Sequence, residues 1–384
     1  MPITTRGGIR RLVLVISLVL IASACGGNDS PTGESTDVSD STSTSVAGDV
    51  EEGEAAPATD DPEPDQTFAL ENGPIEPLTG RPLSDEGLLS RRVVAAKIDN
   101  DEKARPQLGL DEADIVFEIA VENSITRFLA VFHSIEPSLV GPVRSARSSD
   151  LDVLAALSGP FFTYSGSNTI VGQEVRGSEG AGLLIRASFD DVTSAYVDQA
   201  ERPRPHHRMV DPAKVRAQPL TNEEAEVLPV FRYLDADESP EGLTPVAGLR
   251  SVTNARTPVS YVWDKQVGGW HRFQGLTEHL AASGNPVAPT NVVVLEISYK
   301  VSRADAASPQ AVTTGSGPVT VFMNGGLIEG TWTRDAPQDG FDLSDENGNP
   351  IRLWPGQTFV QLVRAGEMTT LADSDAASIL ALAD

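Results

Sequence analysis

The stretch DIVFEIAVENSITRFLAVFH, residues 114–133, decides how the folded part of this sequence is built. It contains two apolar runs rich in β-branched and aromatic residues, which favour strands. The runs are separated by Asn-Ser at 123–124, residue types that favour tight turns. The stretch therefore predicts a β-hairpin with a two-residue turn, in which Glu122 pairs with Ile125.

Alternation along the predicted strands separates two faces. One face is mostly apolar and is expected to be core: Ile115, Phe117, Ile119, Val121, Thr126, Phe128, Ala130 and Phe132. The other face gathers charged side chains: Asp114, Glu118, Glu122, Arg127 and His133. A shift of one residue would distribute the aromatic rings over both faces, so we prefer this register. The charged face is either an exposed surface with cross-strand ion pairs or the floor of a polar cleft.

The loop GPVRSARSSD, residues 141–150, places Arg144 and Arg147 just before a helix predicted at about 149–158, with Ser149 as its cap. Positive side chains are unfavourable at the positive end of a helix unless a negative group is close. That group is either internal, from the hairpin, or an external carboxylate or phosphate held by guanidinium and backbone donors. The candidate ligand-binding residues are Arg144, Arg147, Arg127 and Arg105. The candidate catalytic residues are Glu118, Glu122 and His206.

The amino terminus has the pattern of a bacterial lipoprotein signal. Three arginines precede the apolar run LVLVISLVLIA, and small residues lead to Cys25, the one cysteine of the chain. The run is too short for a comfortable membrane span. We therefore predict a signal peptide over 1–24 and lipidation of Cys25, with the protein outside the cytoplasm on the outer face of the cell membrane. The alternative is an ordinary signal peptide with a coincidental cysteine.

The charge balance and the motifs of the sequence argue against several classes of function. Residues 26–66 contain 12 acidic and no basic residues, and 25–66 is predicted to be a disordered acidic tether. From residue 67 onward, 43 acids face 26 bases, which argues against nucleic-acid binding. No spacing typical of a zinc, Walker or dinucleotide site is present, so we expect no metal and no cofactor. The expected partners are the membrane, through the lipid anchor, and an anionic cell-wall component or an envelope protein.

The element pattern predicts an α+β (mixed α/β) fold with two subdomains, the second mostly antiparallel β. The expected segments are an α/β domain over 67–217, a connecting region over 218–257, a β-rich domain over 258–366 and a tail over 367–384. Further strands are expected at 92–98 and 161–164, and further helices near 191–200 and 211–217. In YSGSNTIVGQE, residues 164–174, the residues Ser165, Gly166, Ser167 and Asn168 are expected to form a turn or to supply hydrogen-bond donors beside the arginine loop. Strands are expected in the second half at 258–264, 269–274, 291–300, 318–323, 327–334, 350–354 and 357–364.

Several stretches resemble the YerB-like bacterial lipoproteins, a family defined by a domain of unknown function. The specific ones are PLTGRPL, KARPQLGLDEADIVFEIAVENSITRFLAVF and GPVRSAR, with looser matches in NVVVLEISY, GTWTR and WPGQTFVQLV. The resemblance runs from about residue 77 to 365 and implies an envelope location and a two-part α/β structure, but no established reaction. Family members tend to have Pro-His-Asn near the end of the first half; RPHHRMV keeps Pro205 and His206 but has His207 in place of the asparagine.

Three functional hypotheses remain. The first is an envelope binding or assembly factor with an Arg-rich cleft for an anion, in which Glu118 and Glu122 orient the arginines. The second is a cell-wall glycan hydrolase or lyase with Glu118 or Glu122 as acid or base and His206 assisting. The third is a structural lipoprotein whose charged groups are internal.

Overall fold

The computed structural model describes residues 74–383 apart from 222–224, 236 and 254–256, and these belong to one unit, Asp65–Asp384. The predicted signal peptide, Cys25 and the acidic tether lie outside the described residues. Within the described ranges, no helix is both long and apolar enough to cross a membrane.

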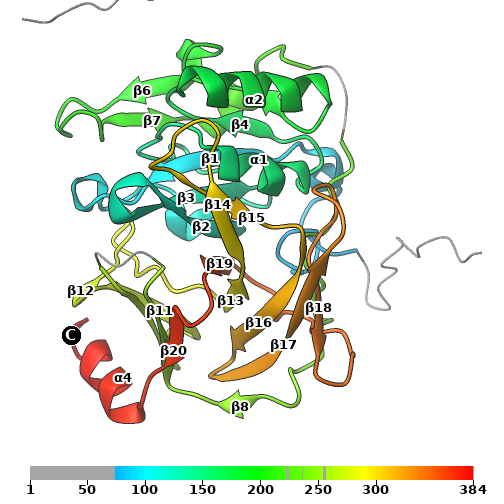
Figure 1. Ribbon diagram of the computed structural model, residues 1–384, viewed down its shortest axis with the longest axis vertical. Coiled ribbons are helices and arrows are strands. Elements are labelled where there is room, and N and C mark those ends of the chain that lie inside the picture. The colour runs from blue at the N-terminus through cyan, green and yellow to red at the C-terminus, as the bar shows by residue number, and fades with distance from the viewer. Residues whose placement is uncertain (1–73, 222–224, 236, 254–256, 384) are drawn as a thin grey trace, which may run out of the picture. The chain divides into compact units, whose positions relative to one another are not determined.

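An 11-stranded mixed sheet contains strands from both halves of the sequence (Figure 1). Its order is β18-β17-β16-β13-β19-β2-β3-β1-β4-β5, with β8 paired to β17. β4 is parallel to β1 and β5, and β19 is parallel to β13 and β2. The strands are β1 (Val94–Asp99), β2 (Ile115–Val121), β3 (Ile125–Phe132), β4 (Phe161–Thr163), β5 (Ile185–Arg186), β8 (Thr244–Pro245), β13 (Asn291–Glu296), β16 (Gly315–Met323), β17 (Gly326–Arg334), β18 (Asp342–Asp345) and β19 (Thr358–Val363).

A second, five-stranded sheet has the order β12-β11-β10-β9-β20. Its strands are β9 (Gly248–Ser251), β10 (Val259–Asp264), β11 (Gly269–Gln274), β12 (Thr277–Glu278) and β20 (Met368–Thr370). Two small ribbons pair β6 (Tyr196–Asp198) with β7 (Arg208–Val210) and β14 (Ser298–Val301) with β15 (Pro309–Val312). The α-helices are α1 (Ser148–Ala155), α2 (Thr169–Gly180), α3 (Pro212–Arg216) and α4 (Asp373–Leu380). The predicted α+β class with a β-rich second half is confirmed.

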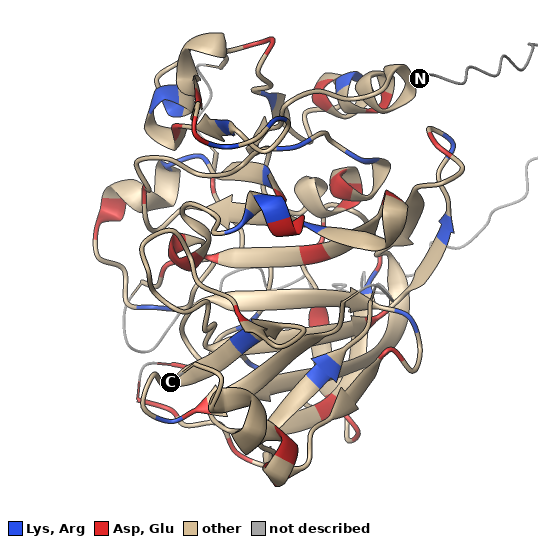
Figure 2. Ribbon diagram, turned by 90° about the vertical axis from the view of Figure 1, so that its left-hand side faces the viewer, with Lys and Arg blue, Asp and Glu red and all other residues tan. Residues whose placement is uncertain are grey.

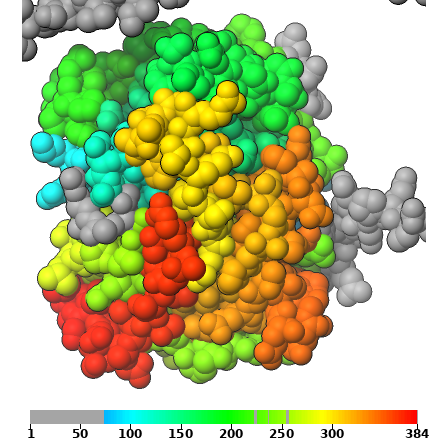
Figure 3. Space-filling model, viewed as in Figure 1, coloured from blue at the N-terminus to red at the C-terminus, as the bar shows by residue number. Residues whose placement is uncertain are grey.

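The central sheet is buried on both faces. Phe117 and Leu129 lie in one apolar cluster with residues of α1 and α2, such as Val153. Phe128 lies in another cluster with residues of the second sheet, such as Trp270. The β14–β15 ribbon, from the second half of the chain (yellow in Figure 3), packs against α1. Ser149 Oγ of α1 accepts a hydrogen bond from Ala311 N at 2.9 Å and donates to the Pro309 carbonyl at 3.3 Å. The two halves of the sequence therefore share their cores.

The predicted hairpin exists, but the predicted register, in which Glu122 pairs with Ile125, differs from the observed one by one residue. Ile119 pairs with Arg127 and Val121 pairs with Ile125. The connection is a 3-10 turn over Glu122–Ser124 rather than a two-residue turn. Because one residue of shift moves every side chain of a strand across the sheet, the aromatic rings lie on both faces, and Glu118 and Arg127 lie on opposite ones.

Several elements outside the hairpin also differ from prediction. Residues 191–200 form a 3-10 turn followed by β6 instead of a helix, and 350–354 forms only isolated bridges. The 291–300 strand is interrupted after Glu296. Residues 165–168 connect β4 to α2 without helix or strand, as expected, but the helix that follows was not expected; the Asn168 side chain accepts a hydrogen bond from Val171 N and caps it. α3 begins at Pro212, capped by Asp211, close to the predicted helix at 211–217.

Charged residues of both signs are interspersed over the ribbon in the view of Figure 2. Lys97, Asp99 and Arg127 nevertheless lie in the interior, with side chains at most a few per cent exposed. Buried charges are costly unless they are paired. The residues that pair with these buried charges therefore show where polar side chains are gathered inside the protein.

Candidate functional site

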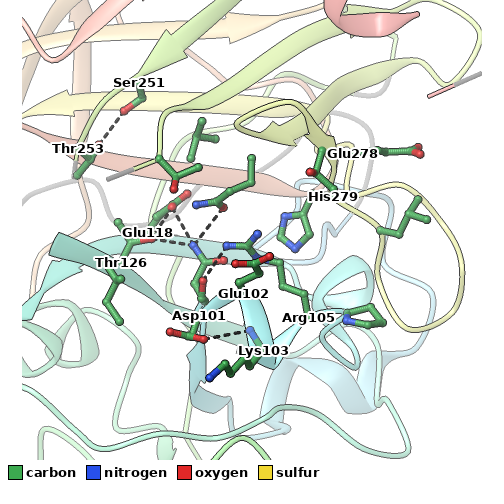
Figure 4. Close-up of a pocket in the computed structure, with 18 of the residues that line it drawn as sticks. Asp101, Glu102, Lys103, Arg105, Glu118, Thr126, Ser251, Thr253, Glu278 and His279 are labelled. Atoms are coloured by element: carbon green, nitrogen blue, oxygen red, sulfur yellow. Dashed lines mark hydrogen bonds between the residues drawn. The ribbon is translucent and has the colours of Figure 1, made fainter. Parts of the chain in front are cut away.

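A cavity of about 660 Å³ lies where the β2–β3 hairpin and the loop after β1 face the second sheet (Figure 4). Its walls are rich in hydroxyl, amide and charged side chains. The lining residues are Asn100, Asp101, Glu102, Lys103, Arg105, Pro106, Glu118, Ser124, Ile125, Thr126, Ser251, Thr253, Thr257, Val259, Gln274, Thr277, Glu278, His279 and Leu280. Two of the predicted site residues, Arg105 and Glu118, are among them.

A fully buried ion pair forms the floor of this cavity. Arg272 of β11 donates from Nη2 to both oxygens of Glu118 of β2, at 3.0 and 2.9 Å. Thr126 Oγ1 and Gln361 Nε2 add hydrogen bonds of 2.7 and 2.9 Å to the same carboxylate. Burial alone would raise the pKa of Glu118, but the charge of Arg272 and these donors lower it below its ordinary value. Glu118 is thus held ionised, with both oxygens already bonded, and it ties the hairpin to the second sheet.

The hydrogen bonds of Arg272 also fix the state of His279. An arginine can only donate, so the contact between Arg272 Nη1 and His279 Nδ1 makes Nδ1 an acceptor. His279 Nε2 then carries the proton and donates to Gln107 Oε1 at 2.8 Å. Burial, and then the charges of Arg272 and Arg105, keep the pKa of His279 well below its usual value. His279 is therefore a neutral wall of the cavity.

Two buried polar atoms at the cavity have no hydrogen-bond partner among the described residues: Asn100 Oδ1 and Arg105 Nε. The neighbouring atoms of both side chains are engaged, since Asn100 Nδ2 donates to Thr126 at 2.8 Å and Arg105 Nη2 donates to the Asn100 carbonyl at 3.0 Å. Burial, and then the charge of Arg272, lower the pKa of Arg105 to about 10, so it remains charged at neutral pH. The cavity thus offers one fixed acceptor and one fixed charged donor.

The other predicted arginines gather on the opposite face of the sheet. Glu122 pairs with Arg127 at 3.2 Å and also accepts from Arg147. Arg147 Nε donates to it at 2.8 Å, and Arg147, rather than the predicted Ser149, is the N-cap residue of α1. We had expected Glu118 to share these arginines with Glu122. That expectation is wrong, because Glu118 is bound by Arg272 across the sheet.

Arg144 and His206 meet at a third carboxylate. Asp99 Oδ2 lies 2.9 Å from Arg144 Nε and 2.7 Å from His206 Nδ1. His207 turns away, with Nε2 3.4 Å from Asp198, as expected for adjacent residues on an extended chain. Arg144, Arg147, Arg127, Glu122 and His206 are not among the residues that line the cavity. The structure therefore divides the predicted site residues between the cavity and a separate charged cluster.

Sequence reasoning missed the residues that the second half contributes. Arg272, Gln274 and His279 face the hairpin from β11 and the segment after β12, more than 150 residues away in the chain. The local signal was the stretch HRFQ at 271–274, which places three polar or charged side chains in the six-residue strand β11. Among the described residues, no group of three or more His, Cys, Asp or Glu side chains is placed to hold a metal ion.

Comparison with known proteins agrees with the resemblance seen in the sequence. Residues 78–225 match the N-terminal domain of a protein family of unknown function, DUF3048, and residues 249–360 match its C-terminal domain. A Bacillus subtilis (strain 168) protein named as a lipoprotein, YerB, is 31% identical over 313 residues, which cover 79% of this chain and 88% of that protein.

The fold also matches an experimental structure. The crystal structure of the Bacillus subtilis YerB protein superposes with a TM-score of 0.68 and 24% identity, and the match covers 78% of this chain and 99% of that one. The two domain matches cover most of the described residues, and the sequence relative covers 79% of this chain. This chain therefore belongs to the YerB-like lipoprotein family defined by the DUF3048 domains.

Proposed function

We propose that this protein is a lipid-anchored binding protein on the outer face of the cell membrane, and that the cavity beside Glu118 takes a polar ligand from the cell envelope. The observation that carries the proposal is the pair of unpartnered buried atoms, Asn100 Oδ1 and Arg105 Nε. Buried polar atoms in a folded protein almost always have a partner. A ligand that both accepts from Arg105 and donates to Asn100 would satisfy both.

The walls favour a ligand with many hydrogen-bonding groups. Six of the lining residues are serine or threonine: Ser124, Thr126, Ser251, Thr253, Thr257 and Thr277. Lys103 and Arg105 supply positive charge for a carboxylate or phosphate. A fragment of the cell wall carries carboxylates, hydroxyls and amides together, and it is present where the lipid anchor would hold the protein.

The first prediction concerns lipid anchoring at Cys25. In C25S the thiol that would carry the lipid is replaced by a hydroxyl, and the chain has no other cysteine. We expect the wild-type protein to sediment with membranes and C25S to appear in the soluble or secreted fraction, as followed by immunoblotting after fractionation. Incorporation of labelled palmitate into the wild type and not into C25S is the matching chemical readout. Membrane retention of C25S would contradict lipid anchoring at this residue.

The second prediction concerns ligand binding in the cavity. We expect the full chain to bind soluble peptidoglycan fragments in isothermal titration calorimetry, and R105Q to weaken that binding by about tenfold or more, because a charge-assisted hydrogen bond is lost. R303Q, which removes an exposed arginine, is the matched control and should bind as the wild type does. No binding by the wild type, or equal losses in R105Q and R303Q, would refute the assignment of the cavity.

The same samples test the enzymatic alternative. Chromatography of the fragments after incubation would reveal new products if the protein cleaved glycan strands. We expect the fragments to be recovered unchanged, because Glu118 is saturated by donors and Glu122 belongs to a different cluster, so the two do not form an acid–base pair across one bond. New products from the wild type but not from E118Q would favour a hydrolase or lyase.

A further inference from the structure

The charged cluster on the α1 face of the sheet is a second polar feature, distinct from the cavity. It consists of Asp99, Glu122, Arg127, Arg144 and Arg147, together with the neighbouring pair Lys97–Asp150. Lys97 Nζ lies 2.5 Å from Asp150 Oδ1, with both side chains fully buried. Three arginines and Lys97 thus face three carboxylates, Asp99, Glu122 and Asp150.

The cations in this cluster repel one another. Burial, and then the charge of neighbouring Arg147, lower the pKa of Arg127 to about 10. Arg127 and Arg147 share Glu122, and Arg144 shares Asp99 with His206. Residues 67–384 contain 43 acidic and 26 basic residues, so this cluster, with four basic and three acidic side chains, has the opposite balance of charge. An additional anion would relieve the repulsion.

Arg144 has the groups to hold that anion. Its Nε faces Asp99 at 2.9 Å, and neither of its Nη atoms donates a hydrogen bond to another residue in the described part of the chain. Its side chain is 22% exposed, so the fork formed by the Nη atoms can be reached from solvent. A guanidinium fork matches two oxygens of a carboxylate or phosphate.

The surroundings of Arg144 also suit an anion. Its backbone lies between the ends of two parallel strands, since Arg144 N donates to Lys97 O of β1 at 2.7 Å and Arg144 O accepts from Ser165 N, just beyond β4, at 3.0 Å. Ligands of open α/β sheets bind outside the carboxyl ends of parallel strands. Both α1 and α2 begin at this edge, shortly after Arg147 and Ser165, and helix N-termini attract negative charge.

We propose that a phosphate group binds at this edge of the sheet, held by the Nη fork of Arg144 and the field of Arg127 and Arg147. The phosphate is either the free ion or part of an envelope polymer. The site is separate from the cavity, since none of these arginines lines it. It therefore does not depend on the proposed binding of cell-wall fragments there.

Calorimetry with two probes at constant ionic strength tests the proposal on the full chain: inorganic phosphate, and a glycerol-phosphate oligomer. We expect one or both to bind, and binding of only one identifies the source. R144Q should weaken binding on the order of tenfold to a hundredfold, as expected for lost charged hydrogen bonds. R144K keeps the charge but not the fork and should weaken binding less than R144Q.

One control makes the result specific to Arg144. R176Q removes one positive charge from the exposed side of α2 and should leave the affinity unchanged. If R144Q proves unstable in a thermal melt, the affinities of R144K and R176Q for the two probes are compared instead, and weaker binding by R144K alone supports the proposal. Absence of binding to both probes, or equal weakening by R176Q and the Arg144 variants, would overturn the proposal. Loss of peptidoglycan-fragment binding in R105Q would test only the cavity.

Discussion

R272M is expected to lower the free energy of unfolding by about 3–5 kcal/mol, because it strands the buried carboxylate of Glu118. Arg272 and Glu118 are both essentially inaccessible to water, and Arg272 supplies two of the hydrogen bonds to that carboxylate. The loss also removes donors to Tyr261 and His279. Urea unfolding followed by tryptophan fluorescence measures the change.

A second variant separates the stranded charge from the loss of packing. Adding E118Q to R272M removes the unpaired charge, so the double variant should recover part of the stability lost in R272M. The matched control is R352M, which breaks an ion pair with Glu238 in which both side chains are more than a third exposed. Such pairs contribute about 0–1 kcal/mol. Equal destabilisation by R272M and R352M would show that the Glu118–Arg272 pair does not hold the two sheets together.

D150A is expected to have a comparable effect, about 3–5 kcal/mol at neutral pH, because it leaves Lys97 charged and alone in the core. Asp150 also accepts from Arg147 N at 2.8 Å and so satisfies a donor at the start of α1. Burial already lowers the pKa of Lys97 even with Asp150 present. Without Asp150 the pKa of Lys97 should fall further, since the opposing charge is gone.

The stabilities of D150A and K97M are expected to change with pH in opposite directions. In D150A the folded state releases the Lys97 proton more easily than the unfolded state, whose lysine titrates near its usual value of 10.5. Stability lost at neutral pH should therefore return as pH rises toward that value. K97M leaves Asp150 unpaired instead, so its deficit should shrink as pH falls. Thermal melts across pH that move in the same direction for both variants would contradict the assigned pair.

The hairpin shows what the sequence could and could not predict. Strand positions at 114–133 were predictable from apolar and β-branched runs. The register was not, because helices cover one face and a second sheet covers the other, so apolar residues such as Val116 and Phe117 follow one another without alternation. A prediction built on one buried face placed Glu118 and Arg127 together, whereas tertiary packing separates them.

The candidate site was predictable where its contacts are local. Glu122 and Arg127 are five residues apart across the turn, and the structure brings Arg147 to the same carboxylate. The partner of Glu118 is 154 residues away, and no local pattern specifies such a pairing. Helix α2 was missed for a related reason: it contains three glycines, which disfavour helix, and its stability depends on packing of Val171 and Val175 into the core.

The most direct measurement is a crystal structure of the protein grown with soluble peptidoglycan fragments. If the cavity is the binding site, density for a fragment will lie beside Asn100 and Arg105, with an oxygen of the fragment within hydrogen-bond distance of Arg105 Nε. A fragment bound elsewhere on the protein while these two atoms face only water would contradict the account.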